Sequence, residues 1–522
     1  MTTVGQALVA GLAARGVEVV FGIPGVHTIE LYRGLAGSRV RHVTARHEQG
    51  AVFMADGYAR VSGKPGVAFV ITGPGLTNAL TAMAQARQDS VPILVISGVN
   101  ARGALGKGWG MLHELPDQAA MVQTLCPTFQ VTGPQALGPV LDAAFAALHS
   151  GRPGPVHIEV PTDVMPLPCE LHPMAVLPYP VAPDADKIAQ ARALLEKAAR
   201  PVILAGGGVR HHGAALQALA EALDAPVVQT INARGLMHAH PLTVPASPSL
   251  TAVRELIAGA DRILAIGTEL GQTDYNMNLD GGLPDLSAMI RVDICPDQLA
   301  RHPATLTLCA DAGLTLAALL PAQSRQTDGA ARAATARQAA RAELAAVYAP
   351  MPHQLTMVEA ITRAIPAAVI VGDSTQPVYA ANLYHDHDRP GGWFNAATGY
   401  GALGFAPGAA VGAALAAPGV PVVCLIGDGG LQFSPGELRT AVDEGLPITF
   451  IVWNNASFRE IAEAMRGAGT EIIGCTPTPL RLQPFAAACD LPFQSVANDP
   501  DALADALAQR GNGPNLIEVR VT

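Results

Sequence analysis

The stretch that decides the fold runs from Pro421 to Glu460 and reads PVVCLIGDGGLQFSPGELRTAVDEGLPITFIVWNNASFRE. Its apolar run at residues 422–426 is short and continuous, as is typical of a parallel strand buried on both faces. The glycine-rich segment 427–430 follows, and its glycines allow a tight turn and a close approach of the backbone to a ligand. A second apolar run, at 448–453, predicts the next strand. The stretch therefore indicates a strand–turn–helix–strand unit of an α/β protein.

The helix between these two strands carries start and stop signals. Ser434 suits the N-cap, Pro435 suits the first helical position, and Glu437 would complete a capping box. Gly445 suits the end of the helix, because glycine readily adopts the left-handed conformation found there. These signals predict a helix that begins shortly after the glycine-rich turn.

Two polar residues, Asp428 and Asn455, follow the two predicted strands directly. In an open parallel sheet, ligands bind beyond the carboxyl ends of the strands, so both side chains are expected at one binding edge. A carboxylate, an amide oxygen and a nearby backbone carbonyl form an all-oxygen site that suits Mg²⁺. Each motif alone would rather indicate an ordinary turn or loop, because short motifs match often by chance. Their joint occurrence on one crossover favours a site for a metal and a diphosphate.

Composition bounds the class of protein. The 522-residue chain has 33 Lys and Arg against 43 Asp and Glu, and this acidic balance argues against a nucleic-acid partner. Seven cysteines are scattered without paired or metal-type spacing, which indicates reduced thiols. No signal peptide and no apolar run of membrane-spanning length are recognised, so no membrane association is expected. We expect a cytoplasmic protein.

Strands and helices alternate in three separate parts of the chain. This pattern predicts an α/β fold of three domains, each with a mostly parallel sheet flanked by helices. The expected domains cover residues 1–165, 186–322 and 351–522. Proline-rich residues 166–184 form the expected first linker, and the Ala-, Gln- and Arg-rich residues 322–349 form a second connector with some helical character.

The motifs Gly427-Asp428-Gly429 and Asn454-Asn455 resemble those of thiamine diphosphate-dependent enzymes of the acetolactate synthase and 2-oxo-acid decarboxylase group. The resemblance spans nearly the whole chain. It implies that Asp428, Asn455 and the carbonyl of Ser457 hold Mg²⁺, with the turn that includes Gly430 at the cofactor diphosphate. It also implies a fold with an N-terminal pyrimidine-binding domain, a central domain and a C-terminal diphosphate-binding domain.

The segment Arg-His-Glu-Gln-Gly-Ala at residues 46–51 resembles a second motif of this group. By that resemblance, the Glu48 carboxyl hydrogen-bonds the aminopyrimidine of the cofactor and helps it to take up a proton. A glutamate in the first turn of a helix is also common for electrostatic reasons alone. Because sites in this group form between subunits, the resemblance implies at least a homodimer, and a homotetramer is the alternative.

Further cofactor-contacting positions follow from the same resemblance. A large apolar side chain at Leu403 would support the bent cofactor, and the carbonyl of Gly401 would receive the aminopyrimidine, so both are counted with the catalytic positions. Plain helix packing is the alternative for Leu403, and a capping turn is the alternative for the residues at 375–376. The remaining expected cofactor contacts are Gly25, Pro74, Gly75, Asn78, Thr375 and Gln376.

The residues expected near the substrate are His113, Glu114, Asp117 and Glu460. His113 stands where acetolactate synthases have a polar glutamine, and a histidine can relay protons at neutral pH. A local hydrogen bond is the alternative role for His113. The three acidic side chains are candidates to bind a guanidinium group, although each is equally consistent with a solvated surface position.

The resemblance implies non-oxidative decarboxylation of a 2-oxo acid. Residues 22–32 and 113–117 look most like those of decarboxylases of 5-guanidino-2-oxopentanoate, the oxo acid derived from arginine. The alternatives are carboligation of pyruvate by an acetolactate synthase-type reaction and a catalytically silent paralogue. FAD is not expected, because residues 267–272 read GTELGQ where flavin-binding relatives carry an Arg-rich stretch.

Overall fold

The computed structural model describes residues 2–170, 180–275 and 284–521. Residues 171–179 of the expected first linker therefore lie outside the described part of the chain. The chain divides into two compact units, which are described separately: one contains residues 1–178, 400–495 and 511–518, and the other contains 179–399, 496–510 and 519–522. None of the described helices combines the length and apolar character needed to cross a bilayer.

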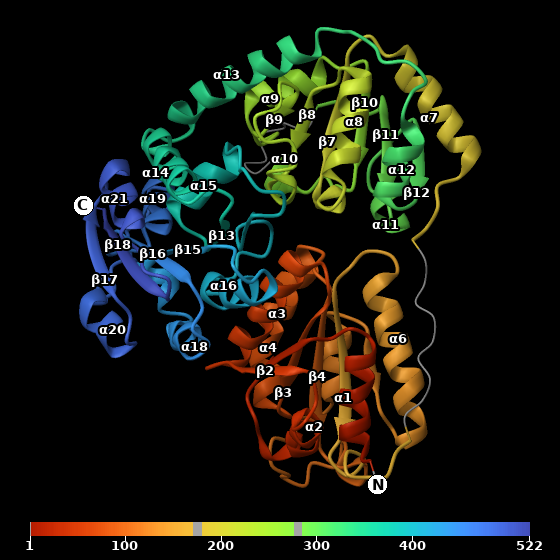
Figure 1. Cartoon of the computed structure of the whole chain (residues 1–522), viewed down its shortest axis with the longest axis vertical. Coiled ribbons are helices and arrows are strands. Elements are labelled where there is room, and N and C mark those ends of the chain that lie inside the picture. The colour runs from red at the N-terminus through yellow and green to blue at the C-terminus, as the bar shows by residue number, and fades with distance from the viewer. Residues whose placement is uncertain (1, 171–179, 276–283, 522) are drawn as a thin grey trace. The chain divides into compact units, whose positions relative to one another are not determined.

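The first sheet is parallel and lies in the N-terminal part of the chain (Figure 1). Its strands are β1 Val19–Gly22, β2 Arg41–Thr44, β3 Gly66–Val70, β4 Ile93–Val99, β5 Thr128–Gln130 and β6 Pro155–Pro161. They are ordered β2-β1-β3-β4-β6-β5. Its helices are α1 Val4–Ala14, α2 Ile29–Leu35, α3 Glu48–Ser62, α4 Pro74–Gln88, α5 Gln118–Gln123 and α6 Leu137–His149. Apolar residues of α1, α2 and α6 share one buried core with residues of the strands.

The central sheet has a different strand order, β12-β11-β10-β7-β8-β9. If the six strands are numbered along the chain and the sheet is read from the β9 edge, the order is 3-2-1-4-5-6, the order of dinucleotide-binding folds. The strands are β7 Pro201–Ala205, β8 Val227–Gln229, β9 Thr243–Val244, β10 Arg262–Ile266, β11 Met289–Asp293 and β12 Leu306–Cys309. The helices are α7 Ala185–Lys197, α8 Gly213–Leu223, α9 Thr251–Ala258, α10 Gln272–Tyr275, α11 Pro296–Leu299 and α12 Ala312–Leu319.

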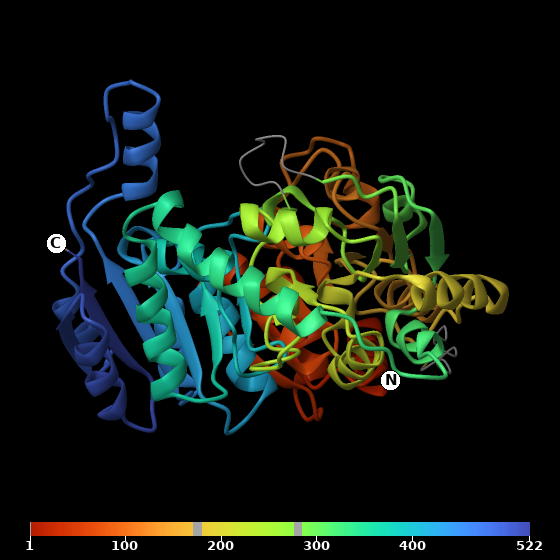
Figure 2. The same cartoon turned by 90° about the horizontal axis from the view of Figure 1, so that it is seen from above.

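The second connector is mainly one helix, α13 Gly329–Val347, seen lengthwise in Figure 2. Ala333, Ala336, Ala340 and Leu344 are buried at intervals of three or four residues, which places them on one face of the helix. They join the core formed by strands of the central sheet. The connector is therefore a packed element of the second unit, which goes beyond the partial helicity expected from its composition.

The third sheet repeats the order of the first: β14-β13-β15-β16-β18-β17 is again 2-1-3-4-6-5 along the chain. Its strands are β13 Val369–Gly372, β14 Trp393–Asn395, β15 Val422–Gly427, β16 Ile448–Asn454, β17 Phe493–Ala497 and β18 Asn515–Arg520. The helices are α14 Met351–Ala364, α15 Gln376–Leu383, α16 Phe405–Ala416, α17 Asp428–Leu431, α18 Glu437–Asp443, α19 Arg459–Gly467, α20 Leu482–Ala488 and α21 Pro500–Ala508. The three-domain parallel α/β fold expected from the sequence is confirmed.

Helices α3 and α16 lie side by side in the first unit and approach at backbone distance (Figure 1). A Cβ atom at Gly57 would overlap the carbonyl oxygen of Ala409, and one at Gly412 would overlap that of Met54. No side-chain layer separates the two helices at these points. The two glycines are therefore required by the close packing of the helices, since any larger residue would force the backbones apart.

The predicted capping box after the glycine-rich turn is wrong. The turn continues into the short helix α17, and α18 begins only at Glu437, with Gly436 at the N-cap and no side-chain cap. The Ser434 hydroxyl instead donates to the carbonyl of Gly404 at 2.7 Å. The Glu437 carboxylate faces backbone N–H groups of the first domain. Partners distant in the sequence have replaced the local ones.

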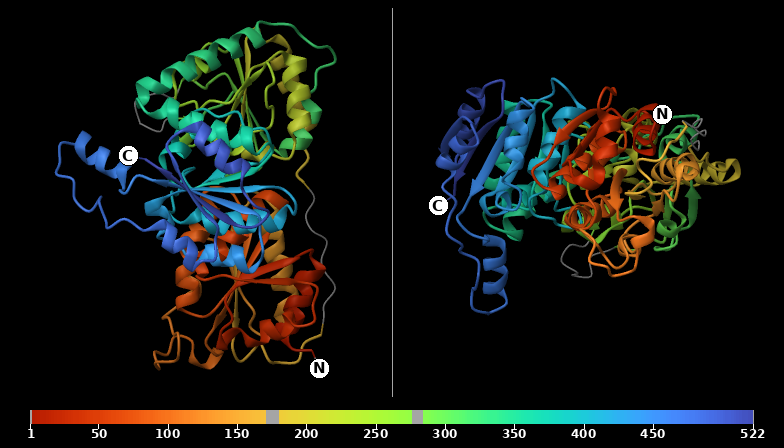
Figure 3. Two further views of the ribbon diagram at one scale, coloured as in Figure 1. Left: turned by 60° about the vertical axis from the view of Figure 1, so that its left-hand side comes forward. Right: turned by 90° about the horizontal axis from the view of Figure 1, so that it is seen from below.

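Helix α19 and the chain that follows it stand away from the strands β15 and β16 (Figures 2 and 3). No residue of α19 is buried in this single chain. Ile461 on α19 and Ile473 after it are both more than half exposed. This projecting segment carries Glu460, one of the residues expected near the substrate.

Candidate cofactor site

Asp428 and Asn455 meet, as their places at two strand ends predict. Asp428 is the first residue of α17, is buried, and its Oδ1 accepts a hydrogen bond from the backbone N–H of Asn455 at 3.2 Å. Burial raises the pKa of Asp428, and hydrogen bonds from nearby backbone N–H groups oppose that rise. A carboxylate held in a partly desolvated position is a favourable partner for a cation.

The loop after β16 is ordered by its own side chains. Asn455 Oδ1 accepts hydrogen bonds from the backbone N–H of Ser457 at 3.1 Å and from its hydroxyl at 3.3 Å. The turn thus fixes Ser457 against Asn455, whose backbone N–H in turn donates to Asp428. The available donors are a carboxylate, an amide oxygen and a backbone carbonyl, which fit Mg²⁺ that also binds ligand phosphates. Among the described residues no cluster of three His, Cys, Asp or Glu side chains forms a separate metal site.

The glycine-rich turn is closely packed. Gly429 and Gly430 are buried, and a Cβ atom at Gly429 would lie 2.6 Å from the ring of Phe458. Glycine at 429 is thus required by a neighbouring aromatic side chain as well as by the turn. The backbone N–H groups at the start of α17 remain suited to a diphosphate by their position after the strand β15.

Glu48, Gly75 and Asn78 are brought together in the first domain. Glu48 is the first residue of α3, and His47 at the N-cap accepts a hydrogen bond from Gln49 N–H at 3.2 Å. The Asn78 amide donates to Glu48 Oε2 at 3.0 Å. A Cβ atom at Gly75 would lie 3.5 Å from Glu48 Oε1, so glycine leaves the carboxylate uncrowded. This grouping is the one expected for the pyrimidine side of the cofactor.

Gly25 and Pro74 occupy the neighbouring strand ends. The backbone N–H of Gly25 donates to the Thr28 hydroxyl at 3.2 Å, and its Cα packs against Ile71 so closely that a Cβ would overlap that side chain. Pro74 is exposed at the first position of α4. Both residues follow strands of one sheet and therefore lie on its carboxyl-end side.

A pair of histidines lies beside this group. The rings of His27 and His113 meet edge to face, with 5.4 Å between their centroids. Each has a buried Nδ1 atom with no hydrogen-bond partner in the described part of the chain, as does the hydroxyl of Thr72. His113 also has a positive φ of 61°, a conformation that is strained for a residue with a side chain. Unpaired buried polar atoms of this kind are typical of a ligand site.

The sequence interpretation missed two residues of this region. His27 lies in the short 3-10 helix Val26–Thr28 between the strand β1 and α2, and the only hint of its role was its membership of the segment 22–32 that resembles the decarboxylases. Gln118 is buried and accepts from the backbone N–H of Gly73 at 3.1 Å, and it donates to the carbonyl of Gly98 at 2.9 Å. Nothing in the sequence linked Gln118 to a residue 45 positions away.

The acidic residues expected near the substrate have separate local roles. Glu114 accepts hydrogen bonds from the backbone N–H groups of Met111 at 3.0 Å and Trp109 at 3.3 Å, and the former is the main cause of its lowered pKa. Asp117 caps α5 by accepting from Ala120 N–H at 2.8 Å. Glu460 lies exposed in the first turn of α19.

Hydrogen bonds to two other parts of the first unit hold the segment 401–404 in place. Gln85 of α4 accepts a hydrogen bond from Ala402 N–H at 3.2 Å, and the carbonyl of Gly404 accepts from Ser434. Gly401 is exposed, and Leu403 is half-buried in the turn just before α16. Its side chain is available for the supporting role implied by the family resemblance.

Thr375 and Gln376 belong to the second unit. Thr375 is the N-cap residue of α15, and Gln376 is its first residue. Both are buried. Their place at the end of the strand β13 and the start of a helix suits a diphosphate contact, as expected from the sequence.

Three family models match consecutive parts of the chain. They describe the N-terminal TPP binding domain of thiamine pyrophosphate enzymes at residues 2–121, the central domain at 188–319 and the C-terminal TPP binding domain at 371–519. The chain therefore belongs to the thiamine pyrophosphate enzyme family.

Curated relatives cover most of the chain. It is 44% identical over 485 residues to the probable 2-ketoarginine decarboxylase AruI of Pseudomonas aeruginosa. The aligned region covers 91% of this chain and 86% of the relative. It is 30% identical to the large subunit of acetolactate synthase isozyme 1 of Escherichia coli, over 98% of this chain and 92% of the relative. The acetolactate synthase large subunit of Corynebacterium glutamicum is 32% identical, over 87% of this chain and 75% of the relative. These relatives are decarboxylase and acetolactate synthase proteins by name.

Proposed function

We propose that this protein is a thiamine diphosphate- and Mg²⁺-dependent decarboxylase of a 2-oxo acid, with 5-guanidino-2-oxopentanoate as its substrate. The observation that carries the reaction class is the presence of two prepared half-sites, Glu48 with Asn78 and Asp428 with Asn455. The substrate rests on the 44% identity to a probable 2-ketoarginine decarboxylase, since 2-ketoarginine is the same compound. Acetolactate synthesis is the second candidate, supported by the relatives at 30–32% identity.

Each residue has a distinct role in this proposal. Bound thiamine diphosphate supplies the nucleophilic carbon and the electron sink for loss of carbon dioxide. Asp428, Asn455 and the Ser457 carbonyl would hold Mg²⁺, and Glu48 would hold a proton at the aminopyrimidine. The Asn78 amide fixes the orientation of the Glu48 carboxyl through the 3.0 Å hydrogen bond. The carboxyl can then donate in one defined direction.

His27 and His113 are proposed to handle the substrate proton. Burial, with a smaller contribution from the neighbouring His113, lowers the pKa of His27. At pH 7 the His27 imidazole is therefore neutral and can act as acceptor or, through its other nitrogen, as donor. A decarboxylase must deliver a proton to the carbon that loses carbon dioxide, whereas a synthase must hold a second oxo acid there. Two unpaired imidazole nitrogens suit the first task.

The substrate is tested by variants on α19. Glu114 and Asp117 already accept local hydrogen bonds, which leaves Glu460 as the candidate partner of the guanidinium. We expect Glu460→Gln to lower kcat/KM for 5-guanidino-2-oxopentanoate by roughly ten- to a hundredfold, as for loss of a charged hydrogen bond, and to leave pyruvate turnover nearly unchanged. The measurement is carbon dioxide release and carboligation product over a panel of 2-oxo acids.

The matched control for this variant is Glu463→Gln. Glu463 lies on the same helix but pairs with Arg466, so its replacement should affect no substrate selectively. Equal losses for the cationic and the small acid in Glu460→Gln would remove Glu460 from substrate recognition. Preference of the unmodified protein for pyruvate, with acetolactate as product, would overturn the decarboxylase proposal in favour of the second candidate.

The complete site is proposed to form between two copies of the chain. Large apolar side chains are exposed in the parts of the first unit that carry the proposed site residues, and exposed apolar surface of this kind can mark a protein interface. Beside Gly25 and His113 they are Val26, Ile29, Trp109, Met111 and Leu112, and in the part with Asp428 they are Phe433, Ile461, Ile472 and Ile473. A second copy would cover these side chains.

Mixing two inactive variants tests the shared site. Glu48→Gln and Asp428→Ala chains, denatured together and refolded, should regain about a quarter of the wild-type activity, because half of the dimers are mixed and each has one intact site. Each variant refolded alone is the control and should stay inactive. No recovery in mixtures shown by mass spectrometry to contain mixed dimers would place both residues of a site on one chain.

A cytoplasmic location is part of the same proposal. All seven cysteines are free thiols, and five of them are buried. Disulfides are rare in reducing compartments, so an arrangement of unpaired thiols supports the cytoplasm.

A further inference from the structure

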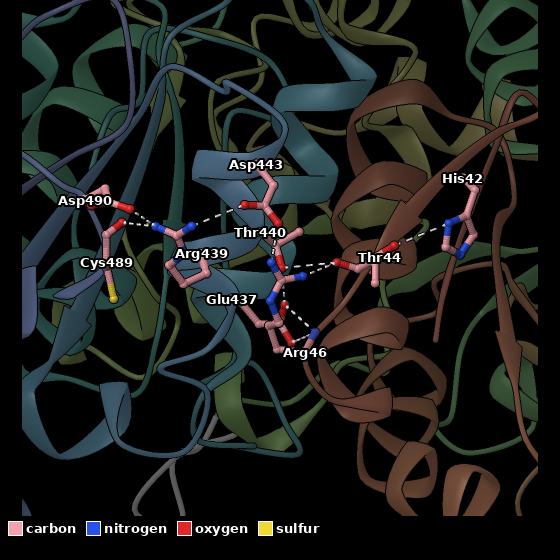
Figure 4. A network of polar contacts seen from close by, with 9 residues as sticks. All are labelled: His42, Thr44, Arg46, Glu437, Arg439, Thr440, Asp443, Cys489 and Asp490. Carbon is pink, nitrogen blue, oxygen red and sulfur yellow. Dashed lines mark hydrogen bonds and ion pairs between the residues drawn. The ribbon is translucent and has the colours of Figure 1, made fainter. Parts of the chain in front are cut away.

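Glu437 lies at the junction between the first domain and the part of the third domain that belongs to the same compact unit. It is the first residue of α18 and only 1% exposed. Its Oε1 accepts hydrogen bonds from the backbone N–H groups of Arg46 and His47, each at 3.1 Å, and its Oε2 lies 3.3 Å from the first of these nitrogens. Figure 4 shows Glu437 beside Arg46. The carboxylate therefore holds two consecutive peptide groups of the other domain.

Those two peptide groups immediately precede Glu48. The N–H groups at the start of a helix have no partner within the helix and must be satisfied from outside. His47 is the N-cap of α3, and its side chain accepts a hydrogen bond from the Gln49 N–H. Glu437 is the acceptor for the N–H groups of the two residues just before the helix, so these residues are held by a side chain from α18.

The packing around the carboxylate leaves it one position. A Cβ atom at Gly50 would overlap Glu437 Oε1, so the side chain lies directly against the first turn of α3. On the other side, the Thr440 hydroxyl donates to Glu437 Oε2 at 2.8 Å. Burial raises the pKa of Glu437, while the hydroxyl and the two backbone N–H groups favour its charged form. The carboxylate is thus enclosed and fully engaged.

The other polar contacts of this junction are weaker constraints. Arg46 pairs with Asp443, and Arg41 pairs with Glu444, but the arginine side chains are one-third to one-half exposed. Exposed ion pairs between long side chains contribute little, because solvent screens them and ordering them costs entropy. The buried Glu437 carboxylate is therefore the contact that fixes the start of α3 (Figure 4).

We propose that Glu437 is a positioning residue for Glu48, which sets the direction of the Glu48 carboxyl by holding the peptide groups in front of it. The inference rests on the proposed role of Glu48. It assigns to Glu437 a task in the reaction, although Glu437 itself need not touch substrate or cofactor. A small displacement of a catalytic group is enough to slow a reaction strongly, so the effect is measurable.

The test compares three replacements of Glu437. In Glu437→Ala both N–H groups lose their acceptor, and in Glu437→Asp the shorter side chain cannot reach both. In Glu437→Gln the amide oxygen can still accept both bonds while its NH₂ faces the Thr440 hydroxyl, which can turn its proton toward the Thr44 carbonyl 3.4 Å away. Asp443→Asn is the control for an exposed contact of the same junction.

Two measurements separate positioning from plain stability. The first is amide hydrogen exchange of residues 44–52 in the protein without cofactor, read by mass spectrometry. The second is exchange of the thiazolium C2 proton at saturating thiamine diphosphate and Mg²⁺. We expect Glu437→Ala and Glu437→Asp to show faster amide exchange and about a hundredfold slower C2 exchange, the loss typical of a misplaced group. Glu437→Gln should stay within about threefold of wild type, because both acceptor bonds are kept; Asp443→Asn should stay within about twofold.

Opposite results would overturn the inference. If Glu437→Ala, or Glu437→Asp where the alanine variant does not fold, lowers the melting temperature but leaves C2 exchange at saturation unchanged, Glu437 is structural only. If Glu437→Gln is as slow as the alanine variant, the charge and not the acceptor geometry matters, which also contradicts positioning. Glu48→Gln is measured alongside: wild-type C2 exchange in that variant would refute the proposed role of Glu48 instead.

Discussion

Replacement of Glu48 by glutamine is expected to slow exchange of the thiazolium C2 proton by roughly a hundred- to ten-thousand-fold, the usual range for loss of general acid–base assistance. The amide occupies the same volume and can still contact Asn78, which donates to Glu48 Oε2 at 3.0 Å. It cannot share a proton with the aminopyrimidine. Binding of thiamine diphosphate, measured by calorimetry, should therefore change little while C2 exchange, measured by quenched-flow NMR, falls.

Glu30→Gln is the matched control for this result. Glu30 also lies in the first turn of a helix of the first domain, but it contacts Arg33 and Thr3 and has no role in the proposed site. Its replacement should leave C2 exchange unchanged. A Glu48→Gln variant that binds the cofactor and exchanges at the wild-type rate would show that Glu48 has a different task.

Asp428→Ala is expected to remove Mg²⁺-dependent retention of thiamine diphosphate while the protein stays folded. Loss of even an indirect partner of a metal costs about 10- to 100-fold in affinity, so loss of the carboxylate ligand should cost at least about a hundredfold. Burial raises the pKa of Asp428, which means that burying its charge costs free energy in the folded protein. Removing that charge should therefore leave the fold intact. Equilibrium dialysis with and without Mg²⁺ measures the retention, and circular dichroism measures the fold.

The control for the metal ligand is Asp490→Ala. This residue also lies in the third domain, but it forms an exposed ion pair with Arg439. Its loss should leave the dependence on Mg²⁺ intact. Undiminished cofactor affinity in Asp428→Ala would contradict the assignment of the metal site and leave the turn at 427–430 with a purely structural role.

Patterns local in the sequence predicted the fold well. The apolar runs at 422–426 and 448–453 became β15 and β16, each longer by one residue. Parallel strands that are buried on both faces consist of continuous apolar residues, so they can be recognised in the sequence. The meeting of Asp428 with Asn455 followed from the same sheet geometry.

Long-range partners explain what the sequence did not reveal. Glu437 was interpreted as half of a local capping box. Its carboxylate instead accepts hydrogen bonds from the backbone N–H groups of Arg46 and His47, about 390 positions away. His27 was noted only as part of the segment 22–32 that resembles the decarboxylases, and its pairing with His113 depends on the order of strands in the sheet. A residue whose partner is remote gives no signal in a single sequence.

The close crossing of α3 and α16 restricts how this enzyme can move. Sliding of packed helices requires side chains that change rotamer as the helices shift. At Gly57 and Gly412 the opposing surfaces are peptide groups, which have no rotamers to change. We therefore expect the helix that begins with Glu48 and the helix that follows Leu403 to move as one rigid piece, and passage of substrate and product to depend on segments outside this crossing.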